Sequence, residues 1–289
     1  MFTERSSYQL VPKSSRPLSR HHQNQLRPFS TMRLFFYLPF CWLIGFSSNA
    51  YPDLHGDQLI NQYLTRSARH DAVLSVSVDY HEPKEEPVRL EFTWMRKVKP
   101  DLTSHLLRID APCSEKGKLL LVHEKADGAT DYIAYRPNSA LKKKVRISGT
   151  RDYKYKGLSI SVQEIIGGEL LKYNHQFKGI EKLNGLTCYV VENQLRVEFK
   201  NDSNYPHLRI YLREDNSMPV RAELFGKSDQ LKLIYFEEVQ KIEGIWTITR
   251  ARVEDSNKSA QLIVTLKEAH YNRDLEDYWF TEEYLKPAQ

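Results

Sequence analysis

The sequence predicts a mainly β protein (α+β), a long antiparallel meander of about eleven strands with few helices. Three observations lead to this fold class. Apolar and polar residues alternate with a period of two along several segments. Turn residues separate these segments at intervals of about ten residues. Patterns with the helical period of 3.6 residues are rare, so the sheet has few helices with which to cover its apolar face.

Four segments show the strand alternation most clearly: 72–80, 88–94, 207–215 and 220–226. In the first, Leu74, Val76, Val78 and Tyr80 share one face of the predicted strand. The other three place Val88, Leu90, Phe92 and Trp94, then Leu208, Ile210 and Leu212, then Val220, Ala222 and Leu224 on one face. Further strands are expected near 105–110, 119–124, 131–136, 143–148, 186–193, 231–238, 245–253 and 261–268.

The connections between these strands carry turn residues. Asn184-Gly185 is a typical two-residue hairpin turn, because both positions of such a turn favour a positive φ. Gly244 marks a second turn, and "REDNSMPV" a third tight connection. No Gly/Ser-rich or Pro-rich linker interrupts residues 51–289, which we interpret as a single domain.

Helix signals are limited to three places. Residues 57–69, "DQLINQYLTRSAR", put Leu59, Ile60, Tyr63 and Leu64 on one face, with Asp57 as the expected N-cap. Residues 158–171 fit a short helix that ends at Gly167-Gly168, and the C-terminal "DLEDYWFTEEYL" fits a turn with a short helix.

A sheet with one apolar face must cover that face. Two arrangements satisfy the pattern. Scarce helices leave an apolar cavity between helix and sheet, the geometry of a carrier for apolar ligands. Alternatively, side chains fill the space and make a dry core.

The N-terminal region is interpreted as an extension followed by a secretory leader. The apolar stretch Leu34–Phe46 is shorter than the roughly twenty residues that span a membrane. Ser48 and Ala50 stand at the positions that signal peptidase reads, so we predict a signal peptide at 32–50, cleaved after Ala50; an uncleaved anchor is the alternative. Residues 1–31 show no periodicity and are interpreted as a disordered or mis-annotated extension.

The charge of the chain is concentrated in this leader. The full chain carries a formal charge of +5. Residues 1–33 hold six basic residues and one acidic residue, and 34–50 hold none, so the remaining chain is neutral. A neutral domain lacks the basic surface that binds phosphates, and we expect no nucleic-acid partner.

Two cysteines remain after the predicted cleavage, Cys113 and Cys188. An oxidising compartment permits a disulfide between them. Two buried free thiols are the favoured alternative.

No motif of an enzyme is found. "HEPKEEP" and "HEKAD" lack the second histidine of a zinc protease, and "SGTRD" lacks the Gly-x-Ser-x-Gly pattern of a nucleophile elbow. No phosphate-binding loop or dinucleotide fingerprint occurs. We therefore expect no catalytic activity, no metal and no cofactor.

Six segments, in this order, resemble the outer membrane lipoprotein-sorting protein family (LolA-like). They are "RIDAPCSEKGKLLLV", "DYIAYRPNSALKKKVRISG", "DYKYKGLSISVQEI", "GIEKLNGLTCYVVE", "LREDNSMPVRAELFGKSDQLKLIYFEEVQKIEGIWTITRARVED" and "LEDYWFTEEYL". The chain departs from the family pattern at Cys113, at Tyr132 and through 148–163.

The resemblance implies an open antiparallel half-barrel whose concave apolar face is closed by helices. It also implies a periplasmic, monomeric carrier of lipid or lipoprotein acyl chains that moves them between membranes or exchanges them with a transporter of the inner-membrane RND type. An envelope sensor or interaction module that binds the periplasmic segment of a membrane protein is the alternative. Arg96 is the candidate for the arginine that locks the family's helical lid. On this reading the expected cavity wall consists of Val76, Val78, Leu90, Phe92, Trp94, Leu107, Ile109, Leu208, Ile210, Leu212, Leu224, Leu233 and Tyr235.

Overall fold

The computed structural model describes residues 55–135, 145–147, 168–201, 203–226, 230–256 and 259–285. All described residues belong to the second of the chain's two units, Ala50–Gln289. The predicted extension, signal peptide and cleavage position lie outside the described residues. Within the described ranges, no helix has both the length and the apolar character needed to cross a membrane.

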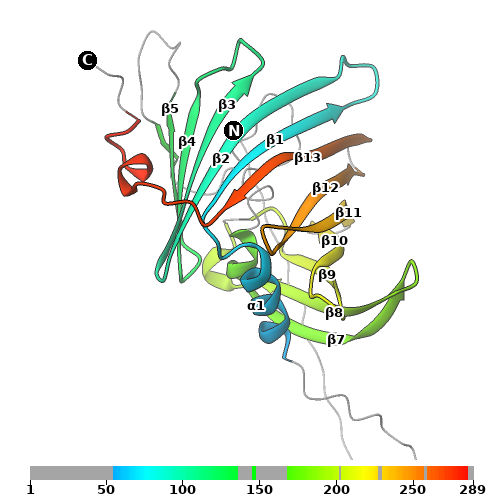
Figure 1. Ribbon diagram of the computed structural model, residues 1–289. Helices are drawn as coiled ribbons and strands as arrows, with labels where there is room; N and C mark the ends of the chain where they lie inside the picture. The colour runs from blue at the N-terminus through cyan, green and yellow to red at the C-terminus, as the bar shows by residue number, and fades with distance from the viewer. Residues whose placement is uncertain are drawn as a thin grey trace, which may run out of the picture. The chain divides into compact units, whose positions relative to one another are not determined.

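The described residues of the second unit contain one antiparallel sheet of thirteen strands (Figure 1). The strand order is β6-β5-β4-β3-β2-β1-β13-β12-β11-β10-β9-β8-β7, so only β1 and β13 pair out of sequence order. The fold class is as predicted, with more strands than the expected eleven. The bounds are β1 Ala72–His81, β2 Val88–Lys99, β3 Leu102–Ala111, β4 Leu119–Lys125, β5 Thr130–Tyr135, β6 Val145–Ile147, β7 Tyr173–Leu183, β8 Leu186–Leu195, β9 His207–Arg213, β10 Pro219–Phe225, β11 Gln230–Ile242, β12 Ile245–Asp255 and β13 Ala260–Tyr271.

The predicted alternation sets the register of the first strands. Leu74 pairs with Trp94, Val76 with Phe92 and Val78 with Leu90. All six side chains are buried on the same side of the sheet. A slip of one residue would turn these side chains to the opposite face, so burial of this face holds the register.

The hairpin turns follow the glycine signals. Asn184 and Gly185 join β7 to β8 with φ angles of 50° and 80°. Glu243 and Gly244 join β11 to β12 with φ angles of 51° and 84°. Two successive positive φ angles match the twist of an antiparallel pair, which is why both connections need only two residues.

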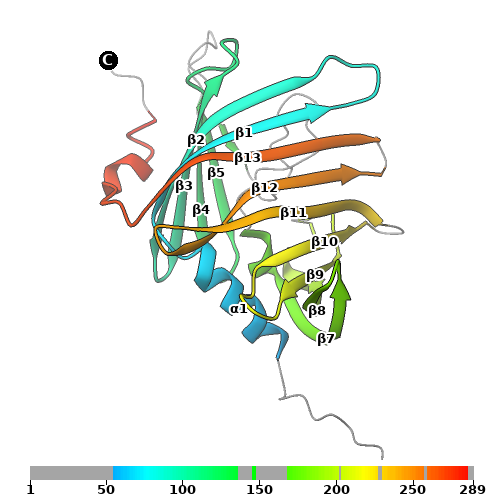
Figure 2. The ribbon, with the colours of Figure 1, turned by 45° about the vertical axis from the view of Figure 1, so that its right-hand side comes forward.

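The helix α1 spans Gly56–Ser67 and lies along one face of the sheet, which we call the inner face (Figures 1 and 2). Leu59, Ile60 and Leu64 are buried, as its sequence pattern predicted. The expected N-cap was wrong by two residues. His55 occupies that position without a capping side-chain hydrogen bond, and Asp57 lies in the first turn, where a negative charge favours the helix dipole.

The other helical segments are short. The 3-10 helix η1 spans Gly168–Lys172, and the rest of the predicted helix at 158–171 lies outside the described residues. A second 3-10 helix, η2, spans Val197–Phe199. The predicted C-terminal turn is confirmed as η3, Asp277–Phe280. With the residues on either side of it, η3 buries the outer face of β2–β5 through Leu275, Phe280 and Leu285.

Both remaining cysteines are free. Cys188 is buried in β8, as a free thiol was expected to be. Cys113 is exposed, contrary to the expectation of two buried thiols, because it lies in the loop between β3 and β4.

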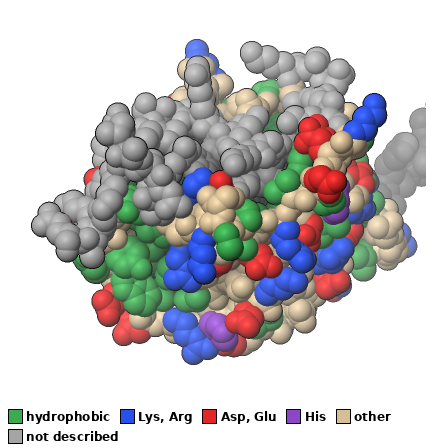
Figure 3. Space-filling model, turned by 90° about the horizontal axis from the view of Figure 1, so that it is seen from above, with side chains coloured by type: hydrophobic (Ala, Val, Ile, Leu, Met, Phe, Trp, Pro, Cys, Tyr) green, Lys and Arg blue, Asp and Glu red, His purple; other side chains and the backbone are tan. Residues whose placement is uncertain are grey.

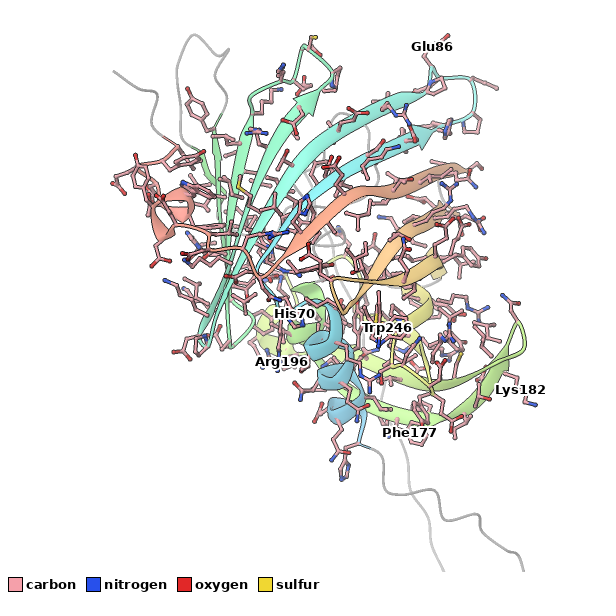
Figure 4. The ribbon with its side chains drawn as sticks, viewed as in Figure 1. His70, Glu86, Phe177, Lys182, Arg196 and Trp246 are labelled. Atoms are coloured by element: carbon pink, nitrogen blue, oxygen red, sulfur yellow. The ribbon has the colours of Figure 1, made fainter. Side chains whose placement is uncertain are left out.

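Arg196 connects parts of the sheet that are distant in strand order. It follows β8, and its Nη2 donates to the carbonyl oxygens of Asp127 and Leu171, each at 2.7 Å. Asp127 lies in the turn between β4 and β5, whereas Leu171 belongs to η1, which leads into β7. Gly128, with φ of 93°, leaves space for the guanidinium, because a Cβ there would lie 3.1 Å from Nη2. We call this contact the Arg196 clasp (Figure 4).

Candidate ligand-binding cavity

A cavity of about 240 Å³ lies on the inner face, between α1 and the sheet. Strands from both halves of the sheet line it, namely β1, β2 and β9–β13, together with the C-terminal half of α1 and η1. Its lining consists of Tyr63, Leu64, Ser67, Ala68, Leu74, Val76, Trp94, Arg96, Leu170, Leu208, Ile210, Ala222, Leu224, Ile234, Phe236, Trp246, Thr247, Ile248, Thr249, Arg250, Ala251, Val253, Val264, Leu266 and Tyr271. Aliphatic and aromatic side chains predominate, so the cavity suits an apolar ligand.

The cover of the cavity is α1, which the sequence positions through its apolar stripe. Leu59, Ile60 and Leu64 pack against the inner face of β8–β10, in a cluster with Val191, Leu208, Ile210, Leu212, Ala222 and Leu224. At the start of the helix, Gly56 lies so close to β7 that a Cβ there would stand 2.5 Å from the carbonyl carbon of His175. Glycine is therefore what allows the helix to lie this close to the sheet.

The cavity lining includes one buried charged side chain, Arg96, which lies beneath the C-terminal end of α1. Its Nε donates to the carbonyl oxygen of His70 at 2.8 Å and its Nη2 to that of Ser67 at 3.1 Å. The guanidinium also lies 5.6 Å from the ring centre of Trp94. Burial lowers the pKa of Arg96, although nearby Tyr271, Tyr63 and Glu124 oppose the shift. Carbonyls at a helix C-terminus lack partners within the helix and carry partial negative charge, so Arg96 fastens α1 to β2.

Trp94 is held on the cavity wall by a buried hydrogen-bonded chain. Its Nε1 donates to Nδ1 of His105 at 3.1 Å, and Nε2 of His105 lies 3.0 Å from Oε2 of Glu124. The indole is only a donor, so Nδ1 of His105 accepts and Nε2 carries the proton that is donated to Glu124. Oε1 of Glu124 is buried without a hydrogen-bond partner in the described part of the chain. These hydrogen bonds fix the orientation of the Trp94 indole against the cavity.

The thirteen side chains expected to form the cavity wall fall into three groups. Five line the cavity: Val76, Trp94, Leu208, Ile210 and Leu224. Six lie elsewhere in the inner-face cores: Val78, Leu90, Phe92, Leu107 and Ile109 among β1–β5, and Leu212 with the apolar side chains of α1. The inner face therefore combines the two arrangements left open by the sequence, with a filled core over β1–β5 and a cavity beside α1. That these residues contact a ligand stays a prediction.

The last two residues, Leu233 and Tyr235, point to the outer face, and their assignment to the cavity was wrong. Ile234 and Phe236 line the cavity instead. On the outer face, the guanidinium of Arg252 lies 4.2 Å from the ring centre of Tyr235. Because residues 233–236 are four apolar residues in succession, alternation alone does not assign them to faces.

Sequence reasoning missed the contribution of β12 to the cavity. The segment 245–253 alternates Ile245, Thr247, Thr249, Ala251 and Val253 with larger, partly charged residues. Thr247, Thr249, Ala251 and Val253 all line the cavity. The alternation was a usable signal, but two threonines made this face look polar.

The site supplies apolar surface and one buried cation. No group of three or more His, Cys, Asp or Glu side chains among the described residues is arranged to hold a metal ion. The arrangement suits burial of a hydrocarbon chain, with Arg96 and the Trp94–His105–Glu124 chain at one end.

Solved structures share this fold over their whole length. A DUF1329 family protein from Desulfovibrio piger superposes with a TM-score of 0.71 at 22% identity, over 80% of this chain and 98% of that one. A putative outer membrane lipoprotein-sorting protein domain from Vibrio parahaemolyticus gives 0.70 at 19%, over 80% and 97%. A LolA superfamily protein from Nitrosomonas europaea gives 0.65 at 18%, over 80% and 99%. The predicted LolA-like fold is thereby confirmed.

At the level of sequence, no curated protein matches the chain. A protein-family model described as "Uncharacterized protein" matches residues 101–287, which include β3–β13 and η3. Since this model spans more than half of the chain, the protein belongs to that family, and it has a LolA-like fold.

Proposed function

We propose that the protein is a periplasmic carrier that binds the acyl chain of a lipid or lipoprotein in the inner-face cavity. It moves this cargo between membranes or exchanges it with a membrane transporter. The supporting observation is the cavity itself, an apolar space beneath a helix that is fastened at one end by Arg96. Binding of this kind uses contact surface and needs no catalytic group.

The size of the cavity fits a ligand that is held loosely. Pockets that enclose a small molecule commonly measure roughly 300–1,000 Å³, and this one measures about 240 Å³. Burying a chain of about sixteen carbons is worth about 12 kcal/mol at about 0.8 kcal/mol per methylene. A chain of that length fills the cavity only if the walls move apart. The work of moving them lowers the affinity, which favours release to an acceptor.

Movement of α1 is the simplest way to enlarge the cavity. The helix contributes Tyr63, Leu64 and Ser67 to the lining, and its C-cap contributes Ala68. Arg96 donates one hydrogen bond to Ser67, the last residue of the helix, and one to His70 in the connection to β1, and the bond to Ser67 breaks if the helix rises. On the face that Figure 3 shows, Lys and Arg side chains are interspersed with Asp and Glu side chains. The described residues of this face therefore form no continuous basic surface.

The first experiment asks whether the protein carries a ligand when purified. The full chain is expressed in a Gram-negative host and isolated from the periplasmic fraction without detergent, and its organic extract is analysed by mass spectrometry. Near-stoichiometric phospholipid or acylated peptide is the expected result. A ligand-free protein that also fails to bind fatty acids would refute the proposal, and crosslinking to membrane proteins would then test the interaction-module alternative.

A second experiment places the ligand in the cavity. Trp94 and Trp246 line the cavity, whereas Trp279 packs on the outer face. A fatty acid brominated on its chain should quench Trp94 and Trp246 more than Trp279, which single-tryptophan variants distinguish. Ala222→Phe puts a ring into the cavity and should weaken binding. Val220→Phe on the same strand is the matched control, because the irregularity between Pro219 and Arg221 turns Val220 to the outer face with Tyr211, contrary to the predicted alternation.

A further inference from the structure

The pairing of β12 with β13 stops halfway along both strands. Their ladder runs from Arg250 opposite Thr265 to Asp255 opposite Ala260. Residues 245–249 of β12 and 266–271 of β13 lie beyond it. Each of these segments is nevertheless paired on its other side, β12 with β11 as far as Ile245 and β13 with β1 as far as Tyr271. The two strands diverge toward α1 in Figures 1 and 2.

The opening between these strands is bounded at both ends, and we call it the β12–β13 window. At one end is the last ladder pair, Arg250 and Thr265. At the other end the hydroxyls of Thr247 and Tyr271 hydrogen-bond at 2.8 Å, and the backbone N–H of Tyr271 donates to Oε2 of Glu243 at 2.9 Å. The window is therefore a defined interruption in the sheet, bounded by the ladder at one end and by side-chain hydrogen bonds at the other.

The inner-face cavity extends to the window. Successive residues of a strand point to opposite faces, so a cavity on one face touches every second residue. This holds on β9, where Leu208 and Ile210 line the cavity, and on β10, where Ala222 and Leu224 do. On β12, by contrast, all six residues from Trp246 to Ala251 line it. Contact with six successive residues places the cavity against an edge of β12, and the edge without a partner strand is the one at the window.

The outer rim of the window combines apolar and basic groups. Trp246 and Ile248 are half-buried there, and Nζ of Lys241 lies 5.0 Å from the ring centre of Trp246 (Figure 4). Lys267 is exposed on β13, at the bulge where pairing with β1 shifts register, and Glu268 is exposed beside it. Arg250 is paired with Glu237. Among the described residues, neither Lys241 nor Lys267 has a carboxylate partner within ion-pair distance, so both are available to an anion.

We propose that the β12–β13 window is the entrance of the cavity for a single-chain amphiphile with an anionic headgroup. This inference deepens the proposed function and depends on it. The chain passes between the strands and comes to lie against Val76, Leu208 and Ile210, while the headgroup remains at the rim with Lys241 and Lys267. An apolar route through the rim keeps the hydrocarbon out of water during transfer, and the two ammonium groups hold the charge where water still solvates it.

The test blocks the window with a bulky group. In a Cys113→Ser background, Ile248→Cys is labelled with a maleimide that carries a poly(ethylene glycol) chain. Glu254→Cys is the control, because it lies on the same strand and face, within the paired stretch. Stopped-flow fluorescence then measures uptake and release of a pyrene-labelled hexadecanoic acid, and equilibrium titration measures Kd.

The label at Ile248→Cys should slow both uptake and release by at least about tenfold relative to the unlabelled variant, because an obstructed passage raises the barrier in both directions, whereas a lost cavity contact would speed release. The label at Glu254→Cys should change neither rate. Unaltered rates in labelled Ile248→Cys, with normal Kd, would refute the window and leave the proposed function intact. Failure of the unlabelled protein to bind the probe would refute the proposed function and this inference together.

A second measurement tests the headgroup and does not depend on labelling. The ratio of the affinities for hexadecanoate and hexadecanol should fall in the Lys241→Gln/Lys267→Gln variant, and salt should weaken hexadecanoate binding less than it does in the wild type. A ratio equal to that of the wild type would refute the assignment of the headgroup to this rim.

Discussion

Replacing Gly56 with alanine tests whether α1 is seated on the sheet as closely as its glycine implies. A Cβ at this position would lie 2.5, 2.6 and 2.7 Å from the carbonyl carbon and oxygen of His175 and the nitrogen of Gln176. Cβ atoms stay at least 3.0 Å from such neighbours, so the start of α1 must move away from β7 by about 0.5 Å. All three atoms belong to backbone, and no side chain can turn aside to relieve the contact.

Two effects of opposite sign determine the stability of the Gly56→Ala variant. In an exposed helix, alanine in place of glycine is worth up to about 1 kcal/mol in favour of the helix. Overpacking against a fixed backbone typically costs about 1–3 kcal/mol. We therefore expect Gly56→Ala to lower the free energy of unfolding by about 1–2 kcal/mol and to speed release of a bound fatty acid.

Urea unfolding followed by circular dichroism measures the stability, and stopped-flow fluorescence measures the release. Asn61→Ala is the control, because Asn61 is exposed on the same helix and gains only helix propensity. If Gly56→Ala were as stable as the wild type or more stable, α1 would not be seated against β7 as described, and the reasoning would fail.

Three further predictions concern the cavity, the titrating groups and the thiols. Arg96→Met removes the bonds to the carbonyls of Ser67, at the end of α1, and His70, in the connection to β1, and should lower stability by about 1–3 kcal/mol, because the lost charge-assisted bonds outweigh the relief of burying a cation. Faster hydrogen exchange at the end of α1 checks this, and unchanged exchange there would contradict it. Burial lowers the pKa of His175 below its ordinary 6.5, although its hydrogen bond to Asn193 opposes the shift, so the folded protein binds fewer protons than the unfolded chain and loses stability as the pH falls below about 6.5. His175→Gln should lose less stability than the wild type between pH 7 and pH 5, and parallel unfolding curves would count against this origin. A thiol reagent should modify Cys113 at once and Cys188 only on unfolding, since burial raises the pKa of Cys188; equal rates would show that both thiols are accessible.

The sequence predicted the fold well where one physical signal was sufficient. In β1 and β2 the alternation is regular, and the burial of Leu74, Val76 and Trp94 followed from it. The turn at Asn184-Gly185 was legible because few other residue pairs adopt two positive φ angles in succession. The position of α1 in the sequence was likewise set by its apolar stripe.

The candidate site was less predictable, because a cavity depends on where side chains do not meet. Phe92 and Trp94 stand on the same face of β2, yet only Trp94 lines the cavity. The difference arises from the approach of α1 and of β9–β13, which is set by contacts distant in the sequence. In β11, Leu233 and Ile234 are equally apolar, and only the register opposite β10 assigns Ile234 to the inner face.

The role of Arg196 shows the same limit, since its partners lie at opposite ends of the strand order. An arginine after a strand reads as an ordinary surface cation. Only the fold brings the β4–β5 turn and η1 to the same guanidinium.

The Arg196 clasp has a mechanical consequence for any cargo larger than the cavity. The hydrogen bonds of Arg196 hold two regions near opposite ends of the sheet together. A curved sheet held in this way deforms at lower energy where its ladder is interrupted than where intact backbone hydrogen bonds would have to stretch. In the described part of the sheet, the half-unpaired stretch of β12 and β13 is such a point of flexure. Widening the space beside α1 should therefore spread these two strands while the clasp stays closed. Spin labels on β12 and β13 should then separate when a fatty acid binds, whereas a pair across Asp127 and Leu171 should keep its distance.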